Sequence, residues 1–454
     1  MVFPTRKKDR RIDRRAVLAS GATLLLVLWV PLLTGLKFPS KMDELGFHVP
    51  NIRRFIDHFP GLQEMRETDL SMLPLFHGLL GSVLRFTGDT LPTMRSCMML
   101  IGLSALFLYL LIARRIPGVD GWKAMPALAA LPYFGVCYFV VMTDYPALLA
   151  LLGSVLGQLA YLRGGRSRAA YAAGLAGAAA CLIRQNLIFA AGVFPLVLWL
   201  QDRRRLEPGA NDGAPPVSPR ARLLRPAIVP ALLLPFLALA FQVWLWRGLI
   251  PPSFMAKPSY IDTSPATTLL SLFSIGANVG YYLLPATFAY ALREGRTYSR
   301  TVWGAVVIVT VFALFWCFHE RGRALVDTYG TFRHGLGFLS DRVGLIFGLG
   351  LLALSLASFF VLLVAGTRRT LQVRSPEMIL LAGLLLASLF VTSYGLFRIY
   401  ERHILPVFVF TVLFFLSAAP EVRKRSFTRG WIATIAFGAA HGVIYSISVY
   451  ELFR

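Results

Sequence analysis

The chain has 454 residues, of which 56% are apolar and 15% are charged, and its formal net charge is +23. An average soluble domain carries about a quarter charged residues, so this composition excludes an ordinary soluble enzyme. Apolar stretches of roughly 18 or more residues recur along the chain, and each is long enough to cross the hydrocarbon core of a membrane. The sequence therefore predicts an all-α, polytopic membrane protein.

The positive charge does not indicate a nucleic-acid partner. Basic residues fall in short clusters between apolar stretches, such as RKKDRRIDRR and EVRKRSFTR. This distribution follows the positive-inside rule, so we expect a cytoplasmic N-terminus and cytoplasmic alternate loops. The four cysteines, Cys97, Cys137, Cys181 and Cys317, lie in apolar stretches and lack metal-ligand spacing, so we expect no disulfide and no metal site formed by them.

Thirteen spans fit the hydropathy pattern, with tight joins near 143–146 and 184–186 that leave twelve or fourteen as alternatives. The first apolar stretch is interpreted as a retained anchor, because no small-residue cleavage site follows it. The expected spans are 16–36, 94–113, 124–142, 146–162, 169–183, 187–201, 227–249, 268–292, 301–318, 343–366, 377–396, 403–419 and 430–450.

A Gly/Pro-rich stretch, GANDGAPPVSPR, marks residues 202–226 as a cytoplasmic linker. It divides the chain into an N-terminal transmembrane module, 1–201, and a C-terminal set of spans, 227–454, although span seven could pack with the first module. The first outer loop, 37–93, contains LSMLPLFHGLLGSVLRF. Its helical apolar spacing, interrupted by proline and polar groups, predicts a helix lying in the membrane interface.

Ionisable and amide side chains gather at the outer ends of the spans. Charged groups at that depth tend to face a cavity and to mark function. The plainer alternative is that loop acids are solvated and arginines reach the interface, and the sequence leaves it open. The candidates are Asp43, Glu44 and His48 in the first outer loop, Asp144 in MTDYPALL, Arg184, Gln185 and Asn186 in LIRQNLIFA, and Glu401, Arg402 and His403 in YERHILPVF.

This set of side chains fits one kind of chemistry. A carboxylate can take the proton of an attacking hydroxyl as general base. The planar fork of arginine matches the oxygens of a lipid phosphate. Cleavage at an anomeric carbon passes through an oxocarbenium-like state, which a second carboxylate can stabilise. The pattern therefore indicates transfer of a sugar from a lipid phosphate, with the phosphate as leaving group.

The same residues resemble a known family. MDELGFHVPNIRRF is similar to the Asp-Glu-x-Phe-His-x-Pro signature in the first lumenal loop of the dolichyl-phosphate-glucose-dependent α-1,2-glucosyltransferases, which belong to the GT-C superfamily. TDYPALLALL resembles their Tyr-Thr-Asp segment, LIRQNLIFA their Arg-Gln-Thr-Asn segment, and YERHILPVF, more loosely, their Asn-Arg-His segment. The four motifs occur in the family's order.

The departures from the family pattern affect the expected specificity. Leu45 and Gly46 stand where the family has one residue before Phe-His. LIRQNLIFA lacks the threonine of Arg-Gln-Thr-Asn, and Glu401 replaces the asparagine of Asn-Arg-His. The resemblance implies Asp43 as catalytic base, with Glu44 as its partner or substitute. It also implies a seven-span N-terminal module followed by a variable set of spans.

We therefore expect an integral membrane hexosyltransferase that uses a polyprenyl-phosphate sugar, with glucose as one candidate, and a glycan or lipid-linked acceptor at the outer face of a bacterial inner membrane. Membrane lipid is the other expected partner. A divalent cation is neither required nor excluded, because an acid pair alone is not a sufficient set of ligands. The alternative is a transporter or flippase of a lipid-linked saccharide, which would place ionisable groups near the midplane in paired repeats.

Overall fold

The computed structural model describes residues 14–37, 44–58, 61–68, 70, 72–205, 229–249, 251, 264–294, 298–321, 345–394, 401–418 and 425–452. No described residue lies in a β-strand, so the predicted all-α class is confirmed for this part of the chain. The long helices are α1 (Arg14–Thr34), α5 (Leu91–Ala113), α8 (Asp144–Gly164), α9 (Ser167–Ile183), α10 (Phe189–Arg205), α12 (Val229–Trp246), α14 (Pro265–Glu294), α15 (Arg300–Arg321), α18 (Leu345–Val373), α19 (Pro376–Ser393), α20 (Glu401–Ala418) and α21 (Arg425–Leu452).

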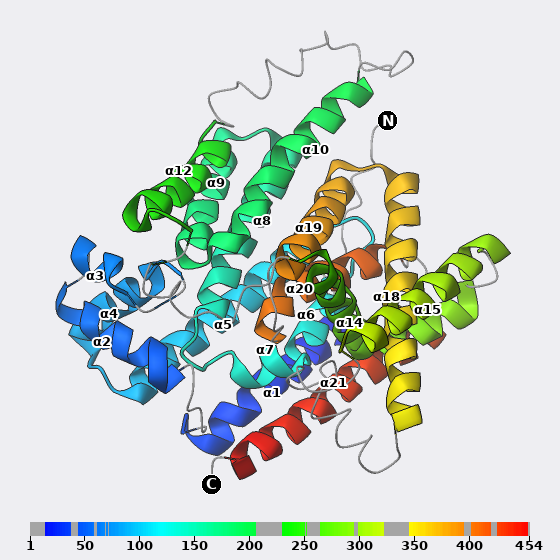
Figure 1. Cartoon of the computed structure of the whole chain (residues 1–454), viewed down its shortest axis with the longest axis horizontal. Helices are drawn as coiled ribbons and strands as arrows, with labels where there is room; N and C mark the ends of the chain where they lie inside the picture. Colours follow the sequence, from blue (N-terminus) through cyan, green and yellow to red (C-terminus); the bar gives the residue numbers. More distant parts are fainter. Residues whose placement is uncertain are drawn as a thin grey trace.

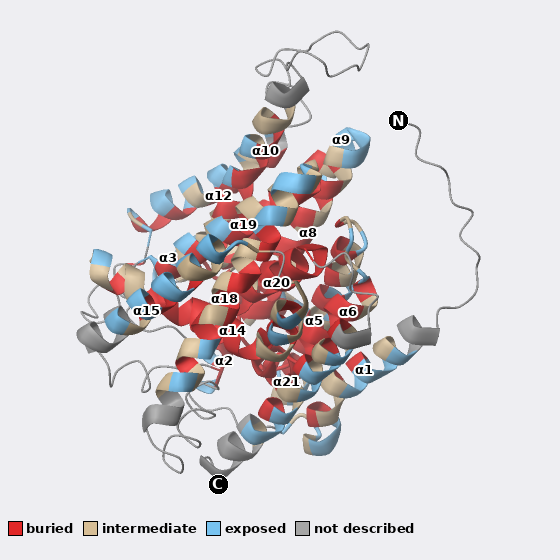
Figure 2. Ribbon diagram, turned by 90° about the vertical axis from the view of Figure 1, so that its right-hand side faces the viewer, coloured by how far each residue is buried: buried red, intermediate tan, exposed pale blue. Residues whose placement is uncertain are grey.

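Short helices connect and flank the long ones. They are the π-helical turn η1 (Glu44–His48), α2 (Val49–His58), α3 (Leu62–Arg66), α4 (Leu75–Thr87), α6 (Gly121–Ala129), α7 (Pro132–Cys137) and the 3₁₀ turn η2 (Gln185–Ile188). Figure 1 shows α2, α3 and α4 grouped at one side of the main bundle. In Figure 2 buried residues run through the centre of the bundle, and exposed residues lie on the outward faces of α1, α9 and α12.

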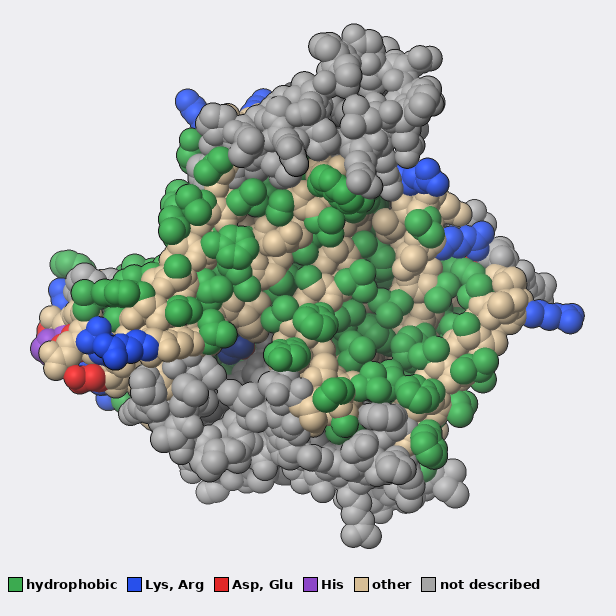
Figure 3. All heavy atoms as spheres, turned by 45° about the horizontal axis from the view of Figure 1, so that its top comes forward, with side chains coloured by type: hydrophobic (Ala, Val, Ile, Leu, Met, Phe, Trp, Pro, Cys, Tyr) green, Lys and Arg blue, Asp and Glu red, His purple; other side chains and the backbone are tan. Residues whose placement is uncertain are grey.

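The bundle has the composition of an integral membrane protein. Within the described residues, α5, α8, α14, α18 and α19 contain five stretches long and apolar enough to cross a membrane. Shorter apolar stretches lie in α1, α9, α10, α12, α15 and α20. Figure 3 shows hydrophobic side chains spread over one face of the bundle, with Lys and Arg at its margins. That arrangement suits a lipid-facing band bordered by charged ends.

The chain begins and ends its helices where capping chemistry dictates. Thr90 caps α5 by accepting a hydrogen bond from the backbone N–H of Thr93 at 3.3 Å. Ser375 caps α19 in the same way, through the N–H of Met378 at 3.2 Å. Helix α8 ends at Gly164, and the next residue, Gly165, caps it with a φ of +61°, in the left-handed region that glycine adopts without steric cost.

The expected span 124–142 is not one helix. It is broken into α6 and α7, and residues 138–143 after α7 are non-helical. Pro132 explains the break, because proline cannot donate a backbone hydrogen bond and disfavours helical geometry at the preceding Leu131, which is extended. The broken segment is almost entirely buried, so its irregular backbone contacts neighbouring helices and not lipid. Because of this break, the number of membrane spans does not follow directly from the number of helices.

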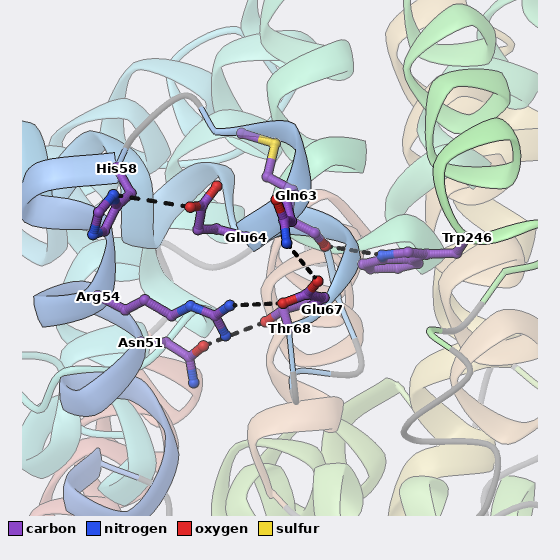
Figure 4. Close-up of polar contacts among 9 residues, drawn as sticks. Asn51, Arg54, His58, Gln63, Glu64, Glu67, Thr68 and Trp246 are labelled. Carbon is purple, nitrogen blue, oxygen red and sulfur yellow. Dashed lines mark hydrogen bonds and ion pairs between the residues drawn. The ribbon is translucent and has the colours of Figure 1, made fainter.

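The first outer loop is joined to α12 beyond the linker. Trp246 donates from Nε1 to the backbone carbonyl of Met65 at 3.0 Å, and both side chains pack with Phe55, Leu73 and Leu245 in a small apolar cluster. Figure 4 shows this junction beside the polar contacts between α2 and the residues that follow α3, among them Arg54 with Glu67 and Asn51 with Thr68. Helix α12 also packs along α9, where a Cβ on Gly177 would lie 3.0 Å from Pro235. The linker 202–226 lies almost wholly outside the described residues.

Helix ends that we assigned to one side of the membrane lie together. At the expected cytoplasmic end, Arg163 of α8 contacts Glu377 of α19 at 3.1 Å, and Trp431 of α21 donates to the carbonyl of Lys123 at 3.0 Å. At the expected outer end, the first loop meets the start of α5 and the segment before α8. The arrangement agrees with the alternation that the sequence predicts, while the absolute orientation stays a prediction.

Reporter fusions test that orientation. Fusions after residues 118, 165 and 210 should report a cytoplasmic location, and fusions after residues 60 and 330 an external one, because cationic loops are retained inside. An alkaline phosphatase and a fluorescent-protein reporter at each site give opposite signals and control for expression. A cytoplasmic signal at residue 60 would place the first loop on the wrong side for the proposed chemistry.

Candidate functional site

Glu44 is held in a buried joint at the start of the first outer loop. Its Oε1 accepts a hydrogen bond from Arg95 Nε at 2.9 Å, and its Oε2 contacts an Nη of the same guanidinium. The backbone N–H of Val141 donates to Oε1 at 2.9 Å. The side chains of Glu44 and Arg95 are 0% and 1% exposed, so the charges must neutralise each other.

The same arginine also ties down the end of the first span. Its other Nη donates to the backbone carbonyl of Leu36 at 2.6 Å. One guanidinium therefore connects the chain just after α1, the turn η1 and helix α5, while the carboxylate adds the segment before α8. With its donors used in this way and almost no exposure, Arg95 is not available as a phosphate contact.

Two other arginines of the loop are exposed and paired locally. Arg53 lies 3.2 Å from Asp89, and Arg54 lies 3.4 Å from Glu67. All four side chains are more than a third exposed. Exposed pairs of this kind contribute little to stability, and their side chains are not held in a fixed arrangement that would select a ligand.

Asp144 and Arg184, which the sequence places on different hairpins, are in direct contact. An Nη of Arg184 lies 2.7 Å from Oδ1 of Asp144, and Arg184 Nε donates to the hydroxyl of Thr143 at 3.3 Å. Arg184 ends α9 and Asp144 begins α8, so helix packing brings the two outer ends together. Val141, which binds Glu44, lies three residues before Asp144 in the chain, so the first outer loop joins the same region.

The Asp144 carboxylate is buried with few partners. Its side chain is 1% exposed, and neither oxygen accepts a hydrogen bond of good alignment from the described residues. Its negative charge is stabilised by the close guanidinium and by its place in the first turn of α8, where the helix dipole favours anions. Arg184, at 13% exposure, is the more accessible partner. The arrangement presents a cation to the site with a carboxylate behind it.

The remainder of the RQN corner forms η2. Gln185 Nε2 lies 3.5 Å from the carbonyl of Leu249, to which Gln242 also donates at 2.8 Å. Asn186 is half-buried in the same turn. The corner therefore contacts the chain just after α12, and residues 252–263 lie outside the described part.

His48 contacts a second histidine that sequence reasoning missed. His48 Nδ1 lies 2.9 Å from His77 Nε2, and the two rings are stacked with centroids 5.1 Å apart. Both are buried. Burial lowers the pKa of His77 well below its usual value, and the neighbouring His48 lowers it further. The pair joins η1 to α4, so His48 contributes to the packing of the loop one turn beyond Glu44.

Several candidates lie outside the described part of the structure. Asp43 immediately precedes it. Glu401, Arg402 and His403 form the start of α20, but their side chains are not described. Their proposed roles stay predictions. Among the described residues no group of three or more His, Cys, Asp or Glu could hold a metal ion.

The structure adds partners that the sequence could only suggest. Arg95 is a lone cation near the start of an apolar span, and His77 is a lone imidazole in LFHGLL. Ionisable groups in such positions usually contact a partner, and this is the feature by which the sequence could have indicated both residues. Thr143 lies inside the MTDY motif but has no signal of its own.

The comparisons with known proteins show one fold-level likeness. No family model matches the chain, and no curated protein matches its sequence. A crystal structure of ArnT from Cupriavidus metallidurans bound to undecaprenyl phosphate is similar with a TM-score of 0.46 and 14% identity, over 92% of this chain and 62% of that one. The chain thus spans less than two thirds of that protein. The particular α-1,2-glucosyltransferase resemblance receives no support, and the interpretation below rests on the chain's own residues.

The buried Glu44–Arg95 pair predicts an asymmetric stability pattern. Glu44→Gln or Arg95→Met alone leaves one charge buried without its partner and should lower the free energy of unfolding by about 3–5 kcal/mol. The double variant removes both charges and should recover most of that loss. Thermal unfolding of the purified protein in detergent measures the effect, with Arg53→Ala as an exposed-pair control that changes little. A double variant as unstable as the worse single one would contradict the buried pair.

The His48–His77 contact predicts a loss of stability in acid. Because folding lowers the pKa of His77, the unfolded chain binds the proton more readily than the folded chain. This contribution is complete above the unfolded pKa of about 6.5 and declines as the pH falls below it. Unfolding temperatures measured between pH 7.5 and pH 5.5 should fall less in His77→Phe than in the wild type. His58→Gln, on the exposed end of α2, is the control, and an equal decline in His77→Phe would show that another group titrates.

Proposed function

We propose that this protein is an integral membrane glycosyltransferase that moves a monosaccharide from a polyprenyl-phosphate donor to a lipid-linked or cell-surface glycan. The observation that carries the proposal is the joint at Glu44. It pins the first outer loop to the segment that leads directly into the Asp144–Arg184 pair. The first outer loop, which carries the carboxylate, and Arg184 thereby meet at one outer end of the bundle.

Arg184 supplies the anion contact in this proposal. It is the partly exposed cation of the site, and its fork suits two phosphate oxygens at once. A polyprenyl chain entering from lipid would present its phosphate at this depth, with its tail along the apolar faces of the helices. Gln185, Asn186 and the YERH segment are proposed to contact the sugar, the phosphate or the acceptor.

Asp43 is the proposed general base, and Glu44 the residue that positions it. Glu44 already accepts from Arg95 and from the Val141 backbone, so its oxygens are engaged. Asp43, the adjacent carboxylate in the chain, is therefore the one proposed to act as the base. It removes the proton of the acceptor hydroxyl, whose oxygen bonds to the anomeric carbon as the bond to phosphate breaks and its electron pair leaves with the phosphate oxygen.

The setting that we propose is the outer face of a bacterial inner membrane, with the N-terminus in the cytoplasm. Glucose is the first donor sugar that we propose, because the first-loop motif resembles that of the α-1,2-glucosyltransferases. A transporter of lipid-linked saccharides is the competing function, and the broken α6–α7 segment is the observation that favours it. Around that break the described residues place tyrosines, such as Tyr145 bonded to the carbonyl of Tyr133 at 2.6 Å. The charged side chain bonded to the segment after α7 is Glu44, which is neutralised by Arg95 and lies at the expected outer end. The enzyme is therefore preferred.

Transfer from a labelled donor tests the function. Purified protein in detergent, incubated with a panel of radiolabelled polyprenyl-phosphate sugars and membrane glycolipid extract, should convert one donor. Asp43→Asn keeps the size of the side chain but removes the proton acceptor, so turnover should fall by about 10² to 10⁴ while donor binding survives. Asp89→Asn, in the same loop, is the matched control and should keep full activity.

Two results would count against this account. Wild-type protein that moves every labelled lipid across a vesicle membrane without breaking the sugar–phosphate bond would establish the transporter. An Asp43→Asn variant with wild-type turnover would remove Asp43 as base and make Asp144 the next carboxylate to test.

A further inference from the structure

The arginine proposed to hold the donor phosphate has a carboxylate behind it. Asp144 is 1% exposed and Arg184 is 13% exposed, with 2.7 Å between Oδ1 and the nearest Nη. Asp144 has no well-formed hydrogen bond within the described part of the chain, so the guanidinium is the one described countercharge beside it, in addition to the N-terminal end of α8. Arg184 therefore cannot move fully toward a ligand without leaving a buried carboxylate uncompensated.

Among the described residues, contacts to the guanidinium of Arg184 occupy one side of it. Its Nε donates to the Thr143 hydroxyl at 3.3 Å, and one Nη contacts Asp144. A guanidinium has five N–H donors in a plane, so the other Nη end keeps donors for a second anion. A phosphate bound there would lie on the far side of the guanidinium from Asp144, close enough for the two negative charges to repel.

The charge of that phosphate changes during the proposed reaction. The donor is a phosphodiester with one negative charge. When the bond to the anomeric carbon breaks, the electron pair stays on the phosphate oxygen and the lipid product is a monoester. A phosphate monoester carries about −1.5 to −2 at pH 7, because its second pKa is near 6.

We propose that Asp144 makes the phosphate site favour the singly charged donor over the more highly charged lipid phosphate product, and so promotes product release. This rests on the proposed function. At roughly 6 Å, repulsion between Asp144 and one full added charge corresponds to about a hundredfold in affinity at the effective dielectric constant of protein sites. Asp144 is thus a specificity-determining residue that acts through Arg184 and does not itself react.

Two probes that share one lipid chain measure this preference directly. They are a short-chain polyprenyl phosphate, which is the monoester, and its methyl ester, which is a singly charged diester. Affinities are measured with the full-length wild-type protein in detergent at pH 8, where the monoester is doubly charged. The wild type should bind the monoester no more tightly than the diester. In Asp144→Asn the monoester should gain about a hundredfold relative to the diester.

Arg184→Lys serves as the matched control. It should weaken both probes and leave their ratio near the wild-type value, because Asp144 is still present. The ratio of affinities cancels any general disturbance of the site, since both probes use the same contact. An Asp144→Asn ratio equal to that of the wild type would overturn the proposal.

The design separates this inference from the function on which it rests. Failure of both probes to bind would count against the proposed function itself, whereas binding of both with an unchanged ratio would count against the role of Asp144 alone. If Asp144→Asn does not fold, the wild-type ratio still decides: a monoester bound tenfold more tightly than the diester would overturn the proposal, and Asp144→Glu, which keeps the charge, should reproduce the wild-type ratio.

Discussion

The site depends on the Glu44–Arg95 ion pair. A membrane protein cannot leave a charge buried at the edge of the hydrocarbon region without a partner, and removing both charges from water is costly unless every lone pair is used. Here the carboxylate accepts from the guanidinium and from the backbone of Val141, and the guanidinium also donates to Leu36. One pair therefore fixes the end of α1, the turn η1, the start of α5 and the segment leading to α8.

The second pair has a different character. Asp144 and Arg184 are close, but the carboxylate is otherwise poorly supplied with donors, and the arginine is the more exposed partner. Arg95 is almost completely buried and all three of its guanidinium nitrogens are engaged, whereas Arg184 is partly exposed and has fewer contacts among the described residues. The contrast between the two explains why one arginine near the first loop has a structural role and another is the candidate ligand contact.

The sequence predicted the helical class and the location of most long apolar helices, because long apolar stretches between basic clusters have few alternative structures. It did not predict the break between α6 and α7, although Pro132 marks its place, because proline is tolerated within many membrane helices. It selected Asp144 and Arg184 from their positions at outer helix ends. It could not pair Glu44 with Arg95, 51 residues away, since that contact depends on where the turn η1 lies relative to α5.

The most direct test of the central claim is an experimental structure of the protein with polyprenyl phosphate bound, determined by cryo-electron microscopy in a lipid nanodisc. We expect the phosphate on the edge of Arg184 that faces away from Asp144, with Glu44 still bonded to Arg95 and Asp43 facing the same space. A phosphate bound at the opposite end of the bundle, near Arg163, or in a path along the α6–α7 break would contradict the claim.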